Sequence, residues 1–216
     1  MMVSTLPVVE KFHSLQGEGA HTGRSAFFIR LALCNVQCPW CDTKNSWSEN
    51  IYPKESLTEL SKNVVEAQSQ GAAFVVITGG EPLHHDLAPL CKAIRLHTLN
   101  KENNSIPIHI ETSGVNELSG QPDWVTLSPK KHALPKDEVL GLCDELKIVI
   151  HDENDLIFAE EMARKTKDHL SRRSSPLLFL QAGWNNTEGQ QLAFDYVKNN
   201  PTWRLSMQTH KWLGIL

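Results

Sequence analysis

The chain has 216 residues, of which 40% are apolar and 21% charged, and its formal net charge is −4. These values are ordinary for a globular protein and exclude global disorder and low complexity. The small acidic excess argues against a general nucleic-acid binder. No apolar run approaches the roughly 18 residues of a membrane span, and residues 1–10 lack the layout of a signal peptide. We expect a cytoplasmic protein with a single domain over residues 1–216.

Short apolar runs rich in β-branched and aromatic residues recur along the chain and predict buried strands. The first run, residues 8–13, is expected to form an edge strand. The later runs span residues 27–33, 74–78, 106–110, 124–127, 146–150, 177–180 and 203–207. Four helix patterns lie between these runs, over residues 56–70, 86–99, 152–167 and 187–199.

Alternating strands and helices predict parallel β-α-β units, whose strands end at a common rim. Only residues 111–123 separate two of the predicted strands, and Gly114, Gly120 and Pro122 argue against a full crossover helix there. The predicted α/β fold is therefore a trimmed, incomplete barrel with about six parallel strands and three or four helices.

Three of the five cysteines, Cys34, Cys38 and Cys41, crowd into a C-x3-C-x2-C run directly after a predicted strand. An odd, crowded set is not typical of a disulfide framework. Three thiolates on one loop suit three corners of a [4Fe–4S] cluster and leave one iron without a protein ligand. A structural zinc site, with His13 or His21 as the fourth ligand, is the alternative.

The other cysteines and a histidine pair receive simpler interpretations. Cys91 lies on the apolar face of its predicted helix and is expected to pack in the core, and no role is assigned to Cys143. The adjacent His84 and His85 face different ways on a regular element, so we expect surface residues there and not a metal pair.

Polar side chains near strand ends are candidates for ligand contact. Arg30 alternates with Phe28 and is expected to point inward, where its guanidinium suits a carboxylate. Glu111 shares a face with His109, and a buried carboxylate is costly unless it is paired. We expect Glu111 to contact a ligand, His109 to be a core residue, and Thr78 to lie at the rim.

The strand at residues 74–78 ends in a Gly-Gly-Glu turn, where Gly79 and Gly80 allow a ligand close to the backbone. This turn, together with the cysteine run and Trp40 directly before its last cysteine, resembles the radical S-adenosylmethionine (SAM) superfamily. The resemblance implies a [4Fe–4S] cluster and SAM as cofactors. It also implies that one-electron cleavage of SAM yields a 5′-deoxyadenosyl radical.

Further motifs resemble the 7-carboxy-7-deazaguanine synthase family over essentially the whole chain. They are Leu15-Gln16-Gly17-Glu18-Gly19, Arg30, Cys41-Asp42-Thr43, Ser128-Pro129-Lys130 and Gln208-Thr209-His210-Lys211. This resemblance implies a radical SAM barrel and a Mg²⁺-dependent lyase of queuosine and 7-deazapurine biosynthesis. The implied reaction contracts 6-carboxy-5,6,7,8-tetrahydropterin to 7-carboxy-7-deazaguanine with loss of ammonia. A homodimer and an electron donor such as a flavodoxin are also implied.

The same resemblance implies the site residues, with no catalytic group beyond the cluster and SAM. The pterin contacts are Leu15, Gln16, Gly17, Glu18, Arg30, Thr78, Glu111, His210 and Leu216. The SAM contacts are Trp40, Cys41, Asp42, Gly79, Gly80, Ser128, Pro129, Lys130, Gln181, Ala182, Gly183 and Trp184, where the family often has Gln-Pro at the start of the last segment. Cys34, Cys38 and Cys41 hold the cluster, and the Thr43 hydroxyl binds Mg²⁺.

The implied role of the C-terminal segment, residues 208–216, is to fold over the active site, where the α-carboxylate of Leu216 accepts hydrogen bonds from the pterin. Simple packing of this apolar end is the alternative. Two other functions also stay open. A radical SAM activase that makes a glycyl radical on a partner protein shares the cysteine motif but does not need the Gln-Gly-Glu-Gly loop. A zinc-bound interaction module would contain zinc in place of iron and sulfide.

Overall fold

The computed structural model describes residues 4–48, 50–169 and 174–216. It divides into two compact units. The first comprises Met1–Leu15, Arg24–Thr112 and Leu118–Trp124, and the second comprises Gln16–Gly23, Ser113–Glu117 and Val125–Leu216. Each unit combines helices with a mainly parallel sheet, which confirms the predicted α/β class. A domain of this size can contain two such units, so the single domain stays a prediction.

The sheet of the first unit has the strand order β3-β1-β2-β4-β5. Its strands are β1 (Thr5–Leu15), β2 (Ser25–Leu31), β3 (Lys54–Ser56), β4 (Phe74–Gly79) and β5 (Ile108–Thr112). Strands β2, β4 and β5 are parallel, whereas β1 runs antiparallel to β2 and β3. The expected edge strand at residues 8–13 is part of the longer β1. The three-residue β3 pairs with residues 5–7 of β1.

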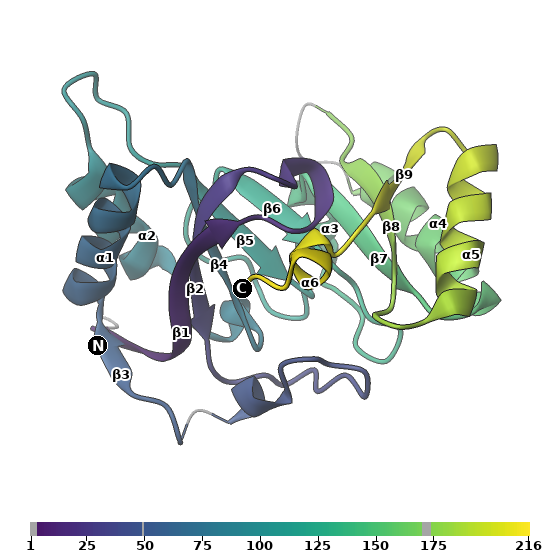
Figure 1. Ribbon diagram of the computed structural model, residues 1–216, viewed down its shortest axis with the longest axis horizontal. Coiled ribbons are helices and arrows are strands. Elements are labelled where there is room, and N and C mark those ends of the chain that lie inside the picture. Colours follow the sequence, from purple (N-terminus) through teal and green to yellow (C-terminus); the bar gives the residue numbers. More distant parts are fainter. Residues whose placement is uncertain (1–3, 49, 170–173) are drawn as a thin grey trace. The chain divides into compact units, whose positions relative to one another are not determined.

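Two helices, α1 (Leu57–Ser69) and α2 (Ala88–Thr98), lie side by side against this sheet (Figure 1). Ser56 caps the N-terminus of helix α1: its hydroxyl accepts a hydrogen bond from the Glu59 amide at 3.1 Å. Alternate residues of β2, Phe27 and Ile29, belong to the core under the helices. Cys91 lies in the same core, as predicted. The intervening residues of β2, which include Arg30, therefore face the side opposite to the helices.

The second unit has four parallel strands in the order β6-β7-β8-β9. They are β6 (Trp124–Leu127, whose first residue belongs to the first unit), β7 (Glu145–Ile150), β8 (Leu177–Ala182) and β9 (Trp203–Ser206). Its helices are α3 (Asp137–Leu142), α4 (Glu153–Asp168), α5 (Thr187–Asn199) and α6 (Thr209–Leu213). Helix α5 packs beside β8 and β9, and α4 packs on β7 (Figure 1).

The four predicted helices are all present in the described residues. The additional α3 and α6 span six and five residues, too few for a helical repeat to show in the sequence. The remaining short elements are the 3₁₀ turns η1 (Gly19–His21), η2 (Lys44–Trp47) and η3 (Pro82–His84). Residues 113–123 contain no helix, as expected. Within the described ranges, no helix is both long enough and apolar enough to cross a membrane.

Candidate active site

Three of the predicted ligand contacts form a row across the first unit's sheet. Arg30 on β2 is in register with Thr78 on β4. The Thr78 hydroxyl donates a hydrogen bond to Glu111 Oε2 on β5 at 3.1 Å. The row lies near the carboxyl ends of three parallel strands and on the side opposite to the helices. Glu111 is half-buried and paired, and His109 is buried and stacks on Phe74 at 4.2 Å between ring centroids, as expected of a core residue.

Arg30 is held at one edge of its guanidinium. Its Nε donates to Oε1 of Glu10 on β1 at 2.6 Å, and the two residues are register partners. The two terminal nitrogens of Arg30 make no hydrogen bond within the described parts of the chain. The guanidinium therefore keeps its outer edge open for a carboxylate.

The cysteine loop follows β2 with two strained residues. Cys34 and Cys38 are buried and Cys41 is half-buried. The residue before each of the first two cysteines has a left-handed backbone, with φ of 82° at Leu33 and 49° at Gln37. This conformation is uncommon and costly for residues other than glycine, and it persists only where the surroundings hold it. The Leu33 amide donates to the carbonyl of Ser46 in η2 at 2.7 Å, which secures the start of the loop.

The Gly-Gly-Glu turn packs against the start of this loop. A Cβ atom at Gly79 would overlap the backbone of Leu31, and one at Gly80 would overlap the Leu33 carbonyl. Gly79 also has a φ of 138°. Both glycines are therefore required by the close approach of β4 to the end of β2, whatever ligand binds there. Glu81 is buried, and its carboxylate accepts hydrogen bonds from the Leu83 amide and the Thr112 hydroxyl.

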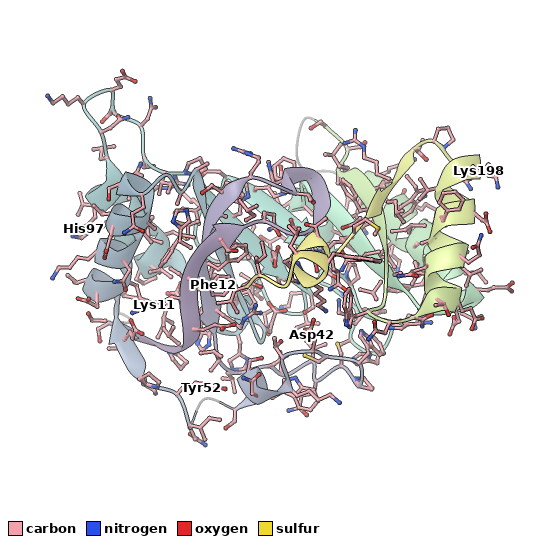
Figure 2. The ribbon with its side chains drawn as sticks, in the orientation of Figure 1. Lys11, Phe12, Asp42, Tyr52, His97 and Lys198 are labelled. Carbon is pink, nitrogen blue, oxygen red and sulfur yellow. The ribbon has the colours of Figure 1, made fainter. Side chains whose placement is uncertain are left out.

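Other predicted residues of the first unit lie around the cysteines. Trp40 and Asp42 are both exposed. Figure 2 labels Asp42 on the loop. The Thr43 hydroxyl lies 3.6 Å from the Cys41 thiol. His84 is exposed, as expected. The expectation was wrong for His85, which is half-buried with Nε2 2.8 Å from the Ala32 carbonyl, because the η3 turn directs its ring toward the end of β2.

In the second unit, the loop between β1 and β2 is bound to the C-terminal segment. The amide and hydroxyl of Thr209 both donate to the Gly17 carbonyl, at 2.9 and 3.1 Å. A Cβ atom at Gly17 would overlap the His210 ring, so only glycine permits this approach. Gln16 is buried, and its Oε1 accepts a hydrogen bond from the Glu18 amide at 3.1 Å. The structure thus brings Gln16, Gly17, Glu18 and His210 together.

Glu18 is held by two side chains from distant parts of the chain. Its Oε2 pairs with the Lys147 ammonium on β7, and its Oε1 accepts a hydrogen bond from Gln208 Nε2 at 2.9 Å. Burial alone would raise the pKa of Glu18, but the charge and hydrogen bond of Lys147, with Gln208, lower that pKa to about 2. Glu18 is therefore an ionised acceptor at neutral pH.

Most of the remaining predicted contact residues lie at or just beyond the ends of strands. Lys130, beyond β6, folds back so that its ammonium donates to the carbonyl and hydroxyl oxygens of Ser128, both at 2.7 Å, and Pro129 between them is buried. Gln181 is buried and accepts a hydrogen bond from the Ser206 hydroxyl at 2.7 Å. Leu15, at the end of β1 in the first unit, and Leu216 are exposed.

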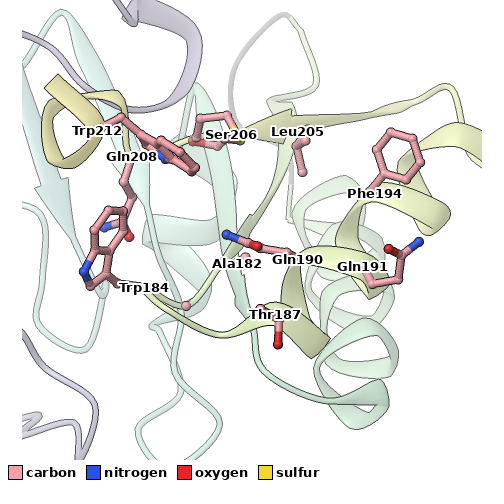
Figure 3. Close-up of a pocket in the computed structure, with 12 residues that line it drawn as sticks. Ala182, Trp184, Thr187, Gln190, Gln191, Phe194, Leu205, Ser206, Gln208 and Trp212 are labelled. Atoms are coloured by element: carbon pink, nitrogen blue, oxygen red, sulfur yellow. The ribbon is translucent and has the colours of Figure 1, made fainter.

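The remaining predicted SAM contacts, at the end of β8 and directly after it, line a pocket of about 470 Å³. Ala182, Gly183 and Trp184 line it together with α5, β9 and the C-terminal segment (Figure 3). Trp184 meets the edge of Trp212, with 6.4 Å between ring centroids. A Cβ atom at Gly183 would overlap the His151 ring. Because glycine has no side chain, the His151 ring can occupy this space.

The sequence comparisons identify the family. The radical SAM superfamily profile matches residues 29–147. The chain is 57% identical over 225 residues to a 7-carboxy-7-deazaguanine synthase of Prochlorococcus marinus, with all of both chains covered. It is 45% identical to the Synechocystis protein of the same name, covering all of this chain and 96% of that one. The chain belongs to the 7-carboxy-7-deazaguanine synthases.

The structural comparison agrees with this membership. The crystal structure of QueE from Escherichia coli matches with a TM-score of 0.78 and 31% identity, covering 94% of this chain and 93% of that one. The predicted radical SAM fold and family are therefore confirmed. Membership among the 7-carboxy-7-deazaguanine synthases also decides against the activase and the zinc module.

The donor set of this synthase fits the cofactors of a radical SAM enzyme. The three cysteines of the loop lie on one segment, and within the described residues none of them forms a disulfide bond. Among the described residues, no three His, Cys, Asp or Glu side chains converge on a point that would hold one metal ion. Cysteine thiolates are the ligands of iron–sulfur clusters, so Cys34, Cys38 and Cys41 are the residues that would hold one.

Several polar residues around the β1–β2 loop escaped the sequence analysis. The Gly19 amide donates to Ser206 Oγ and the Ala20 amide to Glu145 Oε2, both at 3.0 Å. Lys147 and Glu145 are buried on β7. The one available signal was the two charged residues of Glu145-Leu146-Lys147-Ile148, which share a face of an otherwise apolar strand. A lysine there predicts a buried partner but does not identify it.

Proposed function

We propose that the protein converts 6-carboxy-5,6,7,8-tetrahydropterin to 7-carboxy-7-deazaguanine and ammonia, as a radical SAM lyase of 7-deazapurine biosynthesis. Full-length similarity to proteins of this name supports the reaction. The geometric observation that carries it is the row of Arg30, Thr78 and Glu111 at the ends of neighbouring strands, on the sheet that leads into the cysteine loop.

We propose that Cys34, Cys38 and Cys41 hold the [4Fe–4S] cluster. When bound, the cluster and SAM supply one-electron cleavage of a carbon–sulfur bond, which provides a radical able to take a hydrogen atom from the substrate. The left-handed backbone at Leu33 and Gln37 lies directly before the first two of these cysteines. The proposed SAM contacts are Trp40, Cys41, Asp42, Gly79, Gly80, Ser128, Pro129, Lys130, Gln181, Ala182, Gly183 and Trp184.

Arg30 is proposed to bind the carboxylate of the pterin. The pair with Glu10 fixes the guanidinium by its Nε, and the open terminal nitrogens form a two-pronged donor that matches a carboxylate. Glu111 accepts hydrogen bonds from ring N–H groups of the pterin, and Thr78 orients Glu111 through the hydrogen bond between them.

Gln16 and Glu18 are proposed to bind the aminopyrimidinone edge of the pterin. Glu18 offers acceptors only, because it is ionised, and the pterin edge offers an amino group and a ring N–H. Leu15, Gly17 and His210 are expected to complete the contacts. The α-carboxylate of Leu216 is proposed as a further acceptor.

Thr43 is proposed to bind Mg²⁺, because Mg²⁺ commonly takes few protein ligands and keeps water and substrate oxygens. Replacing Thr43 with Ala is expected to preserve SAM binding but to weaken turnover several-fold and flatten its response to added Mg²⁺. Thr58→Ala, on α1, is the matched control. Turnover measured against Mg²⁺ concentration decides, and an unchanged dependence removes Thr43 from the site.

An electron donor such as a flavodoxin, a homodimer and a cytoplasmic location are the remaining proposals from the family resemblance. The reaction itself is tested by anaerobic reconstitution of the cluster, followed by SAM, dithionite, Mg²⁺ and the carboxytetrahydropterin. Mass spectrometry is expected to show 7-carboxy-7-deazaguanine and ammonia with SAM conserved across turnovers. A reconstituted protein that binds SAM but leaves the pterin unchanged contradicts the proposal.

A further inference from the structure

A lysine is buried in the second unit at a position that none of the family motifs in the sequence includes. Lys147 lies in the middle of β7 with 5% of its surface exposed. An ammonium group is costly to bury unless an anion accompanies it. The Glu18 carboxylate pairs with Lys147 from a loop that is 129 residues away along the chain.

The backbone of the loop that carries Glu18 is hydrogen-bonded to Gln16 of the loop itself and to polar side chains of β7 and β9. Successive amides of the loop donate to fixed acceptors: Glu18 N to Gln16 Oε1, Gly19 N to Ser206 Oγ, and Ala20 N to Glu145 Oε2. Ser206 in turn donates to Gln181. The backbone on either side of Glu18 is therefore fixed by bonds that do not involve its own carboxylate.

The Glu18 carboxylate keeps hydrogen-bond acceptor capacity for a ligand even with both of its partners. Lys147 occupies a position on Oε2 and Gln208 one on Oε1. A carboxylate has about four lone-pair sites, so each oxygen can accept another hydrogen bond. An ionised carboxylate of this kind matches two N–H donors side by side, whereas a protonated one presents a donor of its own.

We propose that Lys147 is the positioning residue that keeps Glu18 ionised and aimed, and so determines affinity for the amino-bearing edge of the pterin. This inference rests on the proposed role of Glu18 in pterin binding. The charged groups that face Glu18 are Lys147 from β7 and His210 from the C-terminal segment, while Glu145 lies two residues from Lys147 on β7. Without Lys147, burial raises the pKa of Glu18.

The first test measures kcat and KM for the pterin in Lys147→Met, Lys147→Arg and wild-type enzyme between pH 5.5 and 8. The KM of Lys147→Met is expected to rise about ten- to hundredfold at pH 7, the size of a lost charge-assisted hydrogen bond, with kcat within about threefold. The KM ratio of Lys147→Met to wild type should fall as pH rises, because Glu18 ionises again. Arginine should restore most of the affinity. Lys165→Met, which removes an ion pair on α4, is the matched control.

A KM ratio that is flat with pH, or a loss in kcat at unchanged KM, would overturn the inference. If Lys147→Met does not fold, Lys147→Gln receives the same pH series with Lys147→Arg as the reference that keeps the charge, and a KM ratio of Lys147→Gln to wild type that is flat with pH overturns the inference equally.

The second test needs no turnover and separates this inference from the proposed function. Glu18→Gln is compared in the wild-type and Lys147→Met backgrounds by urea unfolding at pH 7. It is expected to lower the folding equilibrium constant at least tenfold in the first background and less than threefold in the second. Equal effects in both backgrounds contradict the inference even when the wild-type enzyme makes product. If no product forms but the effects differ, the proposed reaction fails and the charge coupling stands.

Discussion

Arg30 in the first unit and Glu18 in the second are each held by an ion pair, but the two pairs are built differently. Arg30 and Glu10 are register partners on adjacent strands, and their side chains are 21% and 39% exposed. Glu18 and Lys147 come from distant parts of the chain, and their side chains are 17% and 6% exposed. Among the described residues, the two terminal nitrogens of Arg30 make no hydrogen bond, whereas Glu18 has partners on both oxygens.

The difference shows how one protein can hold ligand-binding charges in two ways. A partly exposed pair contributes little to stability and leaves capacity for a ligand. A buried pair is costly to break, because either partner alone becomes an uncompensated buried charge. Substitutions at the first kind of site should therefore change activity alone, and substitutions at the second kind should change stability as well.

The largest expected effect is at the cysteine loop, which extends the comparison to the cofactor residues of the first unit. Cys38→Ala should abolish product formation and leave a folded protein, because the thiol lies on a loop outside the main core. Cys91→Ala is the contrasting variant, since that thiol packs in the core and its loss should lower stability but spare activity. Iron and sulfide content, circular dichroism and product yield measure this. An active Cys38→Ala enzyme would contradict the cluster assignment.

The next effect concerns the C-terminal segment of the second unit. A C-terminal extension of several residues should raise the KM for the pterin more than tenfold, because it displaces the α-carboxylate, whereas Leu216→Ala should be tolerated. SAM binding should survive in both proteins. Steady-state kinetics of tagged and untagged enzyme with matched iron content measure the effect. Equal KM values would reduce the segment to simple packing.

A matched pair of substitutions compares the two ion pairs directly. Glu18→Gln leaves the Lys147 charge buried and should lower the free energy of unfolding by about 3 kcal/mol. Glu10→Gln, at the partly exposed pair, should lower it by about 1 kcal/mol or less. Urea unfolding at pH 7 gives both values. Similar losses at the two sites would remove the distinction between the pairs.

The last prediction concerns how the stability contributed by the buried pair depends on pH. The folded pKa of Glu18 is lowered from 4.5 to about 2, so its stabilisation is complete above pH 4.5 and is lost as pH falls toward 2. The loss amounts to about 3 kcal/mol at most. Asp155 adds to it: burial raises its pKa, but Lys131 and two backbone amides outweigh burial and lower it. Unfolding of wild type and Glu18→Gln from pH 7 to 2.5 should converge at the acidic end. Parallel curves would contradict the assignment of the lowered pKa to Glu18.

The sequence was sufficient where the deciding interactions are local. Apolar period and length predicted the strands and the four longer helices, and alternation along β2 and β5 placed Arg30 and Glu111 on the side of the sheet opposite to the helices. The elements it did not predict are β3, α3 and α6, because three to six residues are too few for a period to appear.

The interpretation of the glycine pair also changed with the structure. The sequence indicated that Gly79 and Gly80 leave room for a ligand. The structure shows that the backbone of Leu31 and Leu33 already occupies the space of a side chain at both positions. A glycine motif can thus be required by backbone packing as well as by a ligand, and the sequence alone does not distinguish the two reasons.

By itself the sequence determined the α/β class, the cysteine loop, the family and the strand-end positions of Arg30, Thr78 and Glu111, because each depends on residue type and spacing within a few positions. Only the tertiary structure decided which distant polar groups meet. Lys147 with Glu18, Glu145 with Ala20, and Thr209 with Gly17 are separated by 125 to 192 residues. Such pairings follow from how strands and loops pack, and no local pattern encodes the distance between them.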